Sequence, residues 1–267
     1  MTRQAEISAT EIHSHLGSIA KAAGEAILAI YGQGSEAARV ERKQDESPLT
    51  AADLAAHQVI VAALAAWTPS IPVVSEEDEA SLVHRTPSGT FWLIDPLDGT
   101  KEFIARNGEF TVNIALVRHG LAVAGVVHAP VLGECFVGIE GAGSTVERGG
   151  VESSVRVASD LSPPLRVVAS KSHMNDATRA FIDRLGPCTL VQAGSSLKFC
   201  RVAEGSAHCY PRLGPTCEWD TAAAQAVVEA AGGVVCTLDG QPLRYGKTDI
   251  RNPEFVASAV PLGRLIR

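Results

Sequence analysis

The sequence predicts an α/β protein in which layers of sheet and helix pack against each other. Three observations predict this class. Apolar residues recur at helical spacing near the N-terminus, short apolar runs bounded by turn residues follow from Ile71, and strand-like and helix-like segments alternate in the second half. Layered packing buries the apolar face of each such element. The 267 residues are enough for one large domain or two closely packed lobes.

Composition and charge narrow the class of protein. A chain with 46% hydrophobic and 20% charged residues is globular, and its net charge of −7 argues against a general nucleic-acid binder, which needs a clustered basic surface. The six cysteines form no C-x-x-C pair and no repeated spacing, so we expect reduced thiols. The N-terminus lacks the pattern of a signal peptide, and the apolar run at 121–127 is too short to cross a bilayer. The sequence therefore predicts a cytoplasmic protein without a transmembrane segment. It leaves open both peripheral contact with the cytoplasmic face of the inner membrane and the choice between a monomer and a homodimer.

The first half is predicted to begin with two helices and continue with strands. Charged residues at 41–48 predict an exposed loop, after which Thr50 can cap a helix that runs to about Trp67 and holds Asp53 in its first turn. The apolar runs IPVV, FWLI, TVNIALV, LAVAGVV and ECFVGI predict strands, with a hairpin in GLAVAG. The first helix, ended by the glycines at 32 and 34, buries the positions Ile12, Leu16, Ile19, Ala23, Ile27 and Ile30.

In the second half of the chain, predicted strands alternate with predicted helices. Strands are predicted at 165–170, 188–192 and 207–212, and helices at 174–185, 195–203 and 219–231, the last rich in alanine and closed by Gly232 and Gly233. Neither a repeat nor a low-complexity tract interrupts the chain. Pro163 and Pro164 mark the best boundary between two lobes, residues 1–160 and 161–267, which we expect to form one compact unit.

Two aspartates follow the buried strand FWLI in the segment DPLDGT. Asp95 and Asp98 would repel each other unless a cation neutralises them, and Mg²⁺ prefers such oxygen ligands, to which the Leu97 carbonyl can be added. Gly99 and Thr100 then open a helical segment whose free N–H groups suit a phosphate. An ordinary surface turn has the same residue types and remains the alternative.

Further acidic residues occur at comparable places. SEEDE follows the strand IPVV just as DPLDG follows FWLI, so Glu76 and Glu77 are expected at the same sheet edge as the two aspartates. Asp53 and Asp220 are expected in the first turns of two helices. Taken singly, each has an ordinary explanation, as part of a solvated loop or as a helix N-terminal acid. Together they indicate a metal site.

This combination resembles the lithium-sensitive, magnesium-dependent phosphatases of the inositol monophosphatase superfamily. The strings SPLTAAD, SEED, WLIDPLDGTKEFI, NGEFTVNIALV, GSSLKFC, VAEG, YPR and GPTxxWDTAA resemble, within that superfamily, the bacterial 3'(2'),5'-bisphosphate nucleotidases. The resemblance runs from about residue 10 to 260. It implies a layered α/β/α/β/α sandwich, an order of layers that our strand assignment alone does not fix.

The resemblance also implies the residues of the site. Two or three Mg²⁺ ions would be bound in the first lobe, with one further ligand from the second, and a water molecule would be oriented by Asp53 and Thr100, with Glu76 assisting catalysis. Gly99 and Thr100 would hold the scissile phosphate. The implied metal ligands are Glu76, Asp95, the Leu97 carbonyl, Asp98 and Asp220, and the implied substrate contacts of the second lobe are His173, Ser195, Lys198, Arg212 and Asp220.

The activity implied is hydrolysis of the 3'-phosphate of 3'-phosphoadenosine 5'-phosphate (PAP) to AMP and phosphate. Action on the sulfated parent nucleotide, PAPS, and a role in sulfate assimilation are part of the same expectation. Lys198 and Arg212 are natural partners for a second phosphate, although solvated charges are their ordinary alternative, and helix-cap polar groups are the alternative for Ser195 and His173. The other hypotheses are an inositol monophosphatase, a fructose bisphosphatase and a non-catalytic phosphometabolite sensor.

Overall fold

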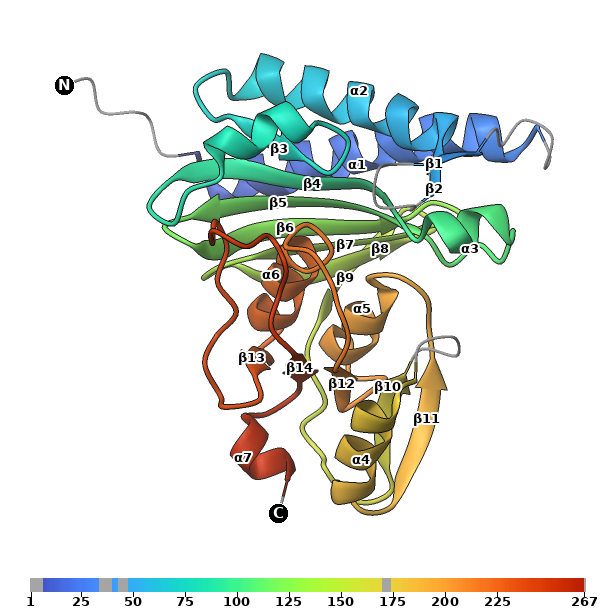
Figure 1. Ribbon diagram of the computed structural model, residues 1–267, viewed down its shortest axis with the longest axis vertical. Coiled ribbons are helices and arrows are strands. Elements are labelled where there is room, and N and C mark those ends of the chain that lie inside the picture. Colours follow the sequence, from blue (N-terminus) through green and yellow to red (C-terminus); the bar gives the residue numbers. More distant parts are fainter. Residues whose placement is uncertain (1–6, 34–39, 43–47, 170–173, 267) are drawn as a thin grey trace.

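The computed structural model describes residues 7–33, 40–42, 48–169 and 174–266, and has the predicted layered α/β/α/β/α arrangement (Figure 1). Helices α1 (Ala9–Tyr31) and α2 (Ala51–Trp67) form the first layer. Short strands β1 (Val40–Arg42) and β2 (Pro48–Thr50) pair within the segment that we predicted as a loop. Ser8 caps α1. The predicted apolar face of this helix is buried at Ile12, Leu16, Ile19, Ala23 and Ile27, whereas Ile30 is only partly buried.

A seven-stranded sheet follows, with its strands in the order β3 to β9. Every neighbouring pair is antiparallel except β3 and β4, which are parallel. The hairpin between β5 and β6 turns at His119 and Gly120, at the start of the predicted GLAVAG segment. The strands are β3 (Val73–Ser75), β4 (Thr90–Asp98), β5 (Thr111–Arg118), β6 (Leu121–Ala129), β7 (Glu134–Ile139), β8 (Gly143–Arg148) and β9 (Val151–Val155).

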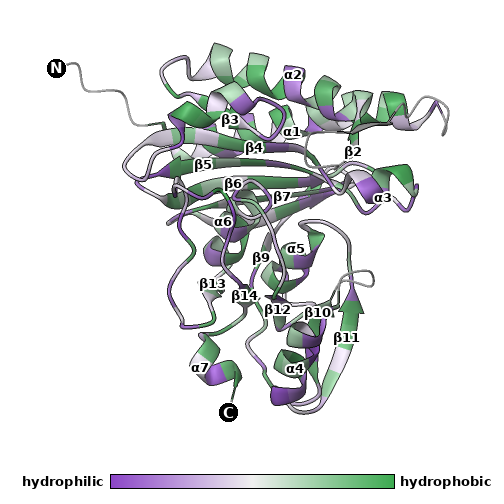
Figure 2. Cartoon of the chain, viewed as in Figure 1, coloured by the Kyte–Doolittle hydropathy of each residue, from purple (hydrophilic) through white to green (hydrophobic). Residues whose placement is uncertain are grey.

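The second sheet has five strands, in the order β11-β10-β12-β14-β13. Helices α5 (Leu197–Ala203) and α6 (Ala222–Ala230) lie between the two sheets, and α4 (Asp176–Arg184) and α7 (Leu262–Leu265) cover the far side of the second (Figure 1). Figure 2 shows apolar residues along the facing elements of these layers. The strands are β10 (Leu165–Ala169), β11 (Cys188–Gln192), β12 (Cys209–Arg212), β13 (Val234–Thr237) and β14 (Phe255–Ser258).

Helix α6 approaches the first sheet very closely, because small residues meet on both sides. A Cβ on Gly125 of β6 would overlap the backbone of Ala223, and a Cβ on Gly138 of β7 would overlap the backbone of Val227. The alanines after Asp220 therefore permit close backbone packing. This contact places the N-terminal end of α6 against the sheet that holds the other acidic residues.

Some predicted bounds are wrong. The last long helix begins at Ala222 rather than Trp219, because Asp220 N–H donates to the Cys217 carbonyl in a turn, so Asp220 precedes the helix. Helix α5 begins at Leu197 rather than Ser195. The Asp-Pro-Leu-Asp segment does not form a separate turn after the strand, since β4 continues through it to Asp98. Helix α3 (Thr100–Ile104) follows at once, and a short 3₁₀ helix, η1 (Glu79–His84), follows β3.

Along the sequence, the strands of the first sheet end at Val155 and those of the second begin at Leu165. The predicted boundary lies in the segment between them, residues 156–164. The division into lobes 1–160 and 161–267 stays a prediction, since the central core joins residues from both halves. All six cysteines are free thiols. No helix in the described part of the chain combines the length and the apolar character that crossing a bilayer requires.

Candidate active site

Three carboxylates from distant parts of the chain converge at one end of the first sheet. Carboxylate oxygens of Glu76, Asp95 and Asp220 all lie within 4.8 Å of one another. Glu76 directly follows β3, and Asp95 lies at the corresponding place in β4, because these strands are parallel and pair Ser75 with Ile94. Asp220 reaches the same place from the turn before α6. The prediction that these two strands bring acids to one sheet edge is confirmed, although Asp95 lies within β4 rather than beyond its end.

A bulge separates the two aspartates of β4. The regular pairing with β5 shifts between Asp95, opposite Asn113, and Asp98, opposite Thr111. Within this irregular stretch the Leu97 N–H donates to Asp95 Oδ1 at 3.1 Å. Extra residues in a bulge re-aim the side chains that follow. Asp98 is thereby partly exposed to the pocket described below, whereas Asp95 is buried.

The electrostatics of the carboxylate cluster are unfavourable without a cation. Burial raises the pKa of Asp95 well above its usual value, and the nearby charges of Glu76 and Asp98 raise it further. Burial also raises the pKa of Asp220, with the same contribution from Asp98 and Glu76. Among the described residues, no Lys or Arg forms an ion pair with Asp95, Asp98 or Asp220. These carboxylates form an all-oxygen donor set, which fits a hard divalent ion such as Mg²⁺.

Asp53 and Thr100 are brought together beside this cluster. Asp53 is buried at the start of α2, where Thr50 N–H and Thr50 Oγ1 donate to its Oδ2 at 2.8 and 2.6 Å. Its other oxygen, Oδ1, lies 3.4 Å from Thr100 Oγ1. Asp53 therefore forms a capping box with Thr50, which is the ordinary role of an acid in the first turn of a helix. It also contacts Thr100, the residue with which we expected it to act.

Ser196 connects the two halves of the site, and sequence reasoning missed it. Its Oγ lies 2.9 Å from Asp98 Oδ2 and 3.1 Å from the Asp220 carbonyl, and it accepts a hydrogen bond from Asn113 Nδ2 at 2.9 Å. The motif GSSLKFC contains two serines, and the sequence analysis selected only the first, Ser195.

The first of these serines, Ser195, makes a different contact. Its Oγ donates to the Asp98 carbonyl at 2.8 Å, and its backbone has a φ of 44°, in the left-handed region. Gly99 has a φ of 94°, and a Cβ there would overlap Ser195 Oγ. Close approach of the two loops therefore requires a glycine at 99. The Ser195 hydroxyl joins these two loops, and its lone pairs remain able to accept a hydrogen bond from a ligand.

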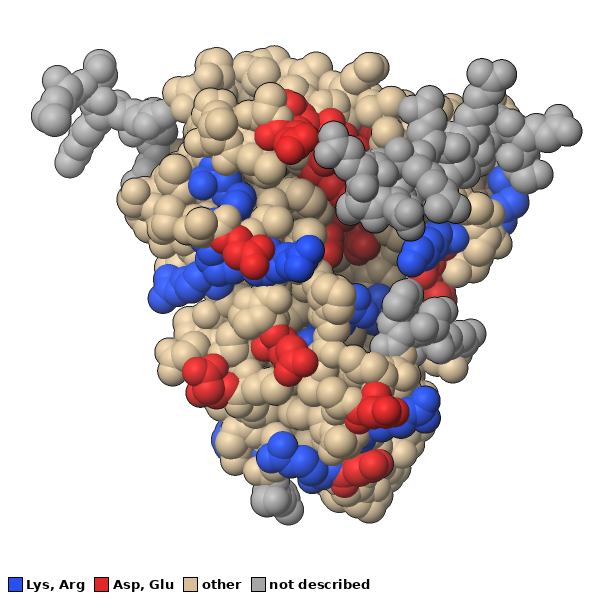
Figure 3. Space-filling model, in the orientation of Figure 1, with Lys and Arg blue, Asp and Glu red and all other residues tan. Residues whose placement is uncertain are grey.

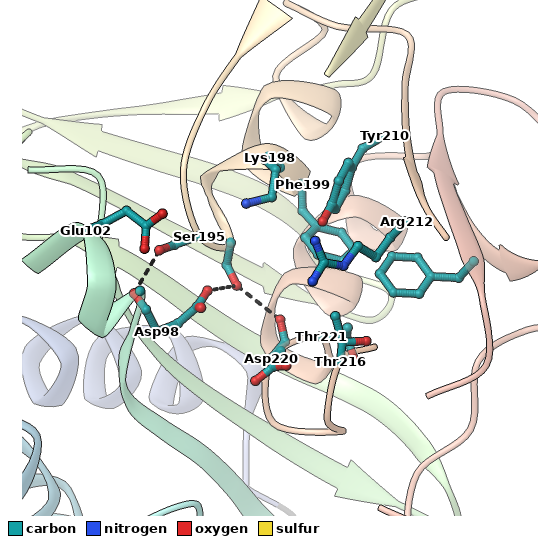
Figure 4. Close-up of a pocket in the computed structure, with 13 residues that line it drawn as sticks. Asp98, Glu102, Ser195, Lys198, Phe199, Tyr210, Arg212, Thr216, Asp220 and Thr221 are labelled. Carbon is teal, nitrogen blue, oxygen red and sulfur yellow. Dashed lines mark hydrogen bonds between the residues drawn. The ribbon is translucent and has the colours of Figure 1, made fainter. Parts of the chain in front are cut away.

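A pocket extends from Asp98 and Asp220 into the second half of the molecule (Figure 4). Lys198 and Arg212 line it, as do Ser195 and Gly99. The Lys198 ammonium lies 5.7 Å from the centroid of the Tyr210 ring, and burial lowers the pKa of Lys198 although Asp98 opposes this. Arg212 donates from Nη2 to the Pro215 carbonyl at 3.0 Å, while its buried Nε has no hydrogen-bond partner among the described residues. Both cations can thus receive an anion.

Figure 3 shows the same charge distribution, with acidic atoms inside the central hollow and basic atoms beside it. His173 lies outside the described residues. Besides Ser196, the lining residues that sequence reasoning did not select are Glu102, Phe199, Tyr210, Thr216, Thr221 and Phe255. The motifs GSSLKFC, YPR and GPTxxWDTAA contained four of them, but an aromatic or threonine side chain gives no signal by itself.

Two known proteins are similar to this chain over nearly its whole length. The 3'(2'),5'-bisphosphate nucleotidase CysQ of Salmonella typhimurium is 49% identical over 238 residues, which are 89% of this chain and 95% of that protein. CysQ of Escherichia coli K12 is 48% identical over 241 residues, 90% of this chain and 96% of that protein.

Solved structures have the same fold. CysQ from Bacteroides thetaiotaomicron, described as a bacterial member of the inositol monophosphatase family, is 40% identical, with a TM-score of 0.81 and coverage of 94% of this chain and 97% of that one. An inositol monophosphatase from Anabaena shares the fold at 24% identity and a TM-score of 0.73, over 97% of this chain and 95% of that one. The model of the inositol monophosphatase family matches residues 8–265. The chain therefore belongs to the inositol monophosphatase family.

Proposed function

We propose that the protein is a magnesium-dependent 3'(2'),5'-bisphosphate nucleotidase that hydrolyses PAP to AMP and phosphate. The observation that supports this most directly is the pocket itself, in which the carboxylate cluster continues into a wall containing Lys198 and Arg212. A substrate with two phosphates would place one at the carboxylate end and the other at the cationic wall. The names of the curated relatives, which are about half identical over nearly the whole chain, support the same substrate class.

The residues that would hold the metal are Glu76, Asp95, Asp98, Asp220 and the Leu97 carbonyl. We propose two or three Mg²⁺ ions there during turnover. When bound, divalent ions of this kind lower the pKa of a water nucleophile and stabilise charge on the leaving oxygen. Bound cations would also offset the repulsion that raises the pKa of Asp95 and Asp220.

Asp53 and Thr100 would orient the water. Thr100 Oγ1 can donate to Asp53 Oδ1, which leaves the lone pairs of the threonine oxygen to accept a hydrogen bond from water. The second Asp53 oxygen is held by Thr50, so the pair has a fixed orientation. In the reaction, water adds to phosphorus, the bond from phosphorus to the 3'-oxygen breaks, and that oxygen receives a proton to give AMP.

Phosphate release from purified protein with Mg²⁺ tests this proposal. PAP, PAPS, inositol 1-phosphate and fructose 1,6-bisphosphate would be offered in parallel, and we expect a strong preference for PAP. Preference for inositol 1-phosphate or fructose 1,6-bisphosphate would retain the metal site but refute the proposed substrate. Release of phosphate from none of them would favour a sensor, which would bind PAP without hydrolysing it. If the wild type does hydrolyse PAP, Asp98→Asn should retain most of the binding while turnover collapses, because the acid then serves the chemistry.

Lys198 offers a second test that depends on the other phosphate. We expect Lys198→Gln to raise KM for PAP about tenfold while KM for 3'-AMP, which lacks the 5'-phosphate, changes little, because a charge-assisted contact is lost only with PAP. The exposed Lys101→Gln serves as the control for a change of net charge. Equal changes in KM for PAP and 3'-AMP would show that Lys198 does not contact the 5'-phosphate.

A further inference from the structure

Glu102 lies in the active-site pocket, where its charge acts on Lys198 without a hydrogen bond or a close ion pair. It belongs to the first turn of α3, two residues after Thr100, and lines the pocket together with Ser195 and Lys198. Its Oε2 would lie 3.2 Å from a Cβ built on Gly99, so the carboxylate is adjacent to the predicted phosphate site. Figure 4 shows the carboxylate directed toward Ser195. Within the described residues, the Glu102 side chain forms neither a hydrogen bond nor an ion pair.

This position is unexpected for an acidic side chain. A carboxylate repels a phosphate, and Glu102 is not part of the metal cluster of Glu76, Asp95 and Asp220. A carboxylate can only accept hydrogen bonds at neutral pH. Its natural partner in this pocket is therefore a neutral donor on the substrate, close to the scissile phosphate but distinct from it.

The cationic residues of the pocket determine which part of the substrate this is. Lys198 and Arg212 line the same pocket, and the proposed function places the second phosphate beside them. The sugar must then lie between the two phosphates, with one edge beside Glu102. In a ribonucleoside 3',5'-bisphosphate, the only hydroxyl adjacent to the 3'-phosphate is the 2'-hydroxyl of the ribose, which is a neutral donor.

We propose that Glu102 is a specificity-determining residue whose carboxylate accepts a hydrogen bond from the ribose 2'-hydroxyl. The residue thereby selects ribonucleotide over 2'-deoxyribonucleotide bisphosphates. This inference rests on the proposed function and names the part of the substrate that the pocket recognises. A buried or half-buried carboxylate left without its donor is unfavourable, so the deoxy substrate loses more than one neutral hydrogen bond.

The test compares kcat/KM for PAP and for 2'-deoxyadenosine 3',5'-bisphosphate. We expect the wild type to prefer PAP by roughly tenfold or more, because hydrogen bonds to charged groups are the stronger class. In Glu102→Ala the ratio should fall toward one. In Glu102→Gln, which keeps an acceptor oxygen without the charge, the ratio should be intermediate.

Glu109→Ala is the matched control. It removes the same charge from the neighbouring segment, and Glu109 does not line the pocket, so it should keep the wild-type ratio. Thermal melting of each variant verifies that it is folded. Wild-type turnover of PAP combined with an unchanged ratio in Glu102→Ala would overturn this inference alone. An equal loss for both substrates would overturn it too, since that is the result of a general electrostatic effect. Failure of the wild type to hydrolyse PAP would instead refute the proposed function.

Discussion

The hydroxyl oxygen of Ser196 lies 2.9 Å from Asp98 Oδ2 and 3.1 Å from the Asp220 carbonyl oxygen. A side chain from the loop before α5 therefore contacts one candidate metal ligand directly and the backbone of another. Because a hydroxyl has a single proton, its stronger bond is the one donated to the charged carboxylate. Ser196 thus fixes the orientation of Asp98 relative to the segment that contains Asp220.

We expect Ser196→Ala to weaken Mg²⁺ binding and to lower kcat at limiting Mg²⁺ by about tenfold, with partial recovery at high Mg²⁺, because a supporting contact to a metal ligand is lost. The measurement is a Mg²⁺ titration of phosphate release, repeated by calorimetry with protein alone. Ser154→Ala, on the exposed strand β9, is the control. The same half-saturating Mg²⁺ concentration in Ser196→Ala and wild type would show that Asp98 needs no such support.

The carboxylate cluster predicts an unusual dependence of stability on pH in metal-free protein. Burial and neighbouring acids raise the folded-state pKa of Asp95 above the unfolded value of 3.8. Below the unfolded pKa, both states hold the proton and no stability is lost. As the pH rises toward the folded-state pKa, the unfolded state releases its proton first, so the free energy of unfolding falls.

We therefore expect Asp95→Asn to be more stable than wild type at neutral pH in EDTA, by roughly 1 kcal/mol or more, since each pKa unit corresponds to about 1.4 kcal/mol. At acidic pH the difference should disappear. Saturating Mg²⁺ should raise the wild-type Tm more than that of the variant, because ligands stabilise the state that binds them. Thermal melts across this pH range give the answer, with the exposed Asp183→Asn as control. A wild type that stays more stable than Asp95→Asn in EDTA at neutral pH would refute the argument.

Local patterns predicted much of this fold and site. The helical spacing from Ile12 to Ile27 predicted the buried face of α1, and the apolar runs before Glu76 and Asp95 predicted two strands that bring these acids to one edge, although β4 continues to Asp98. Strands β8 and β9 were missed, because their sequences GSTVER and VESSV are mostly polar and lack the continuous apolar pattern of a covered strand. Hydrophobic periodicity is a signal of burial, and it is weak in these two strands because they lie at the end of the sheet.

The parts of the site that escaped prediction depend on packing between distant segments. Ser196 contacts Asp98 across 98 positions of the chain, and no local pattern distinguishes it from Ser195. Glu102 similarly becomes notable only because Ser195 and Lys198 face the same pocket. The start of α6 was misplaced for a different reason: Asp220 and Thr221 are both suitable residues before a helix, and the turn with Cys217 selects Thr221 as the N-cap.

Glu218 anchors the segment before Asp220 through buried charges. It is fully buried, lies 3.2 Å from Arg85 Nη1 and 2.5 Å from Lys247 Nζ, and accepts the Gly246 N–H at 2.8 Å. We expect Glu218→Gln to lower the free energy of unfolding by about 3 kcal/mol, because the buried Arg85 charge loses its partner. Urea denaturation measures this loss. As a control, Glu254→Gln at an exposed position should change the free energy of unfolding by no more than about 0.5 kcal/mol. A similarly small effect of Glu218→Gln would mean that water solvates the Arg85 charge once its partner is lost.

Two glycine substitutions should have opposite effects on stability. Gly125 faces the backbone of Ala223, and an added methyl group would have to displace α6, whereas a Cβ on Gly17 in α1 would meet nothing within 4 Å. We expect Gly125→Ala to destabilise the protein by about 1–3 kcal/mol through overpacking and Gly17→Ala to stabilise it by about 0.5–1 kcal/mol through helix propensity. Urea denaturation compares the two.

The first substitution should also affect the site, because α6 follows Asp220 directly. Displacement of the helix moves this carboxylate away from Glu76 and Asp95, so Gly125→Ala should require more Mg²⁺ for half-maximal phosphate release, while Gly17→Ala should leave that concentration unchanged. A Gly125→Ala protein that is destabilised but binds Mg²⁺ normally would show that the turn from Cys217 to Thr221 holds Asp220 independently of the helix. Wild-type stability in that variant would show that the sheet moves instead.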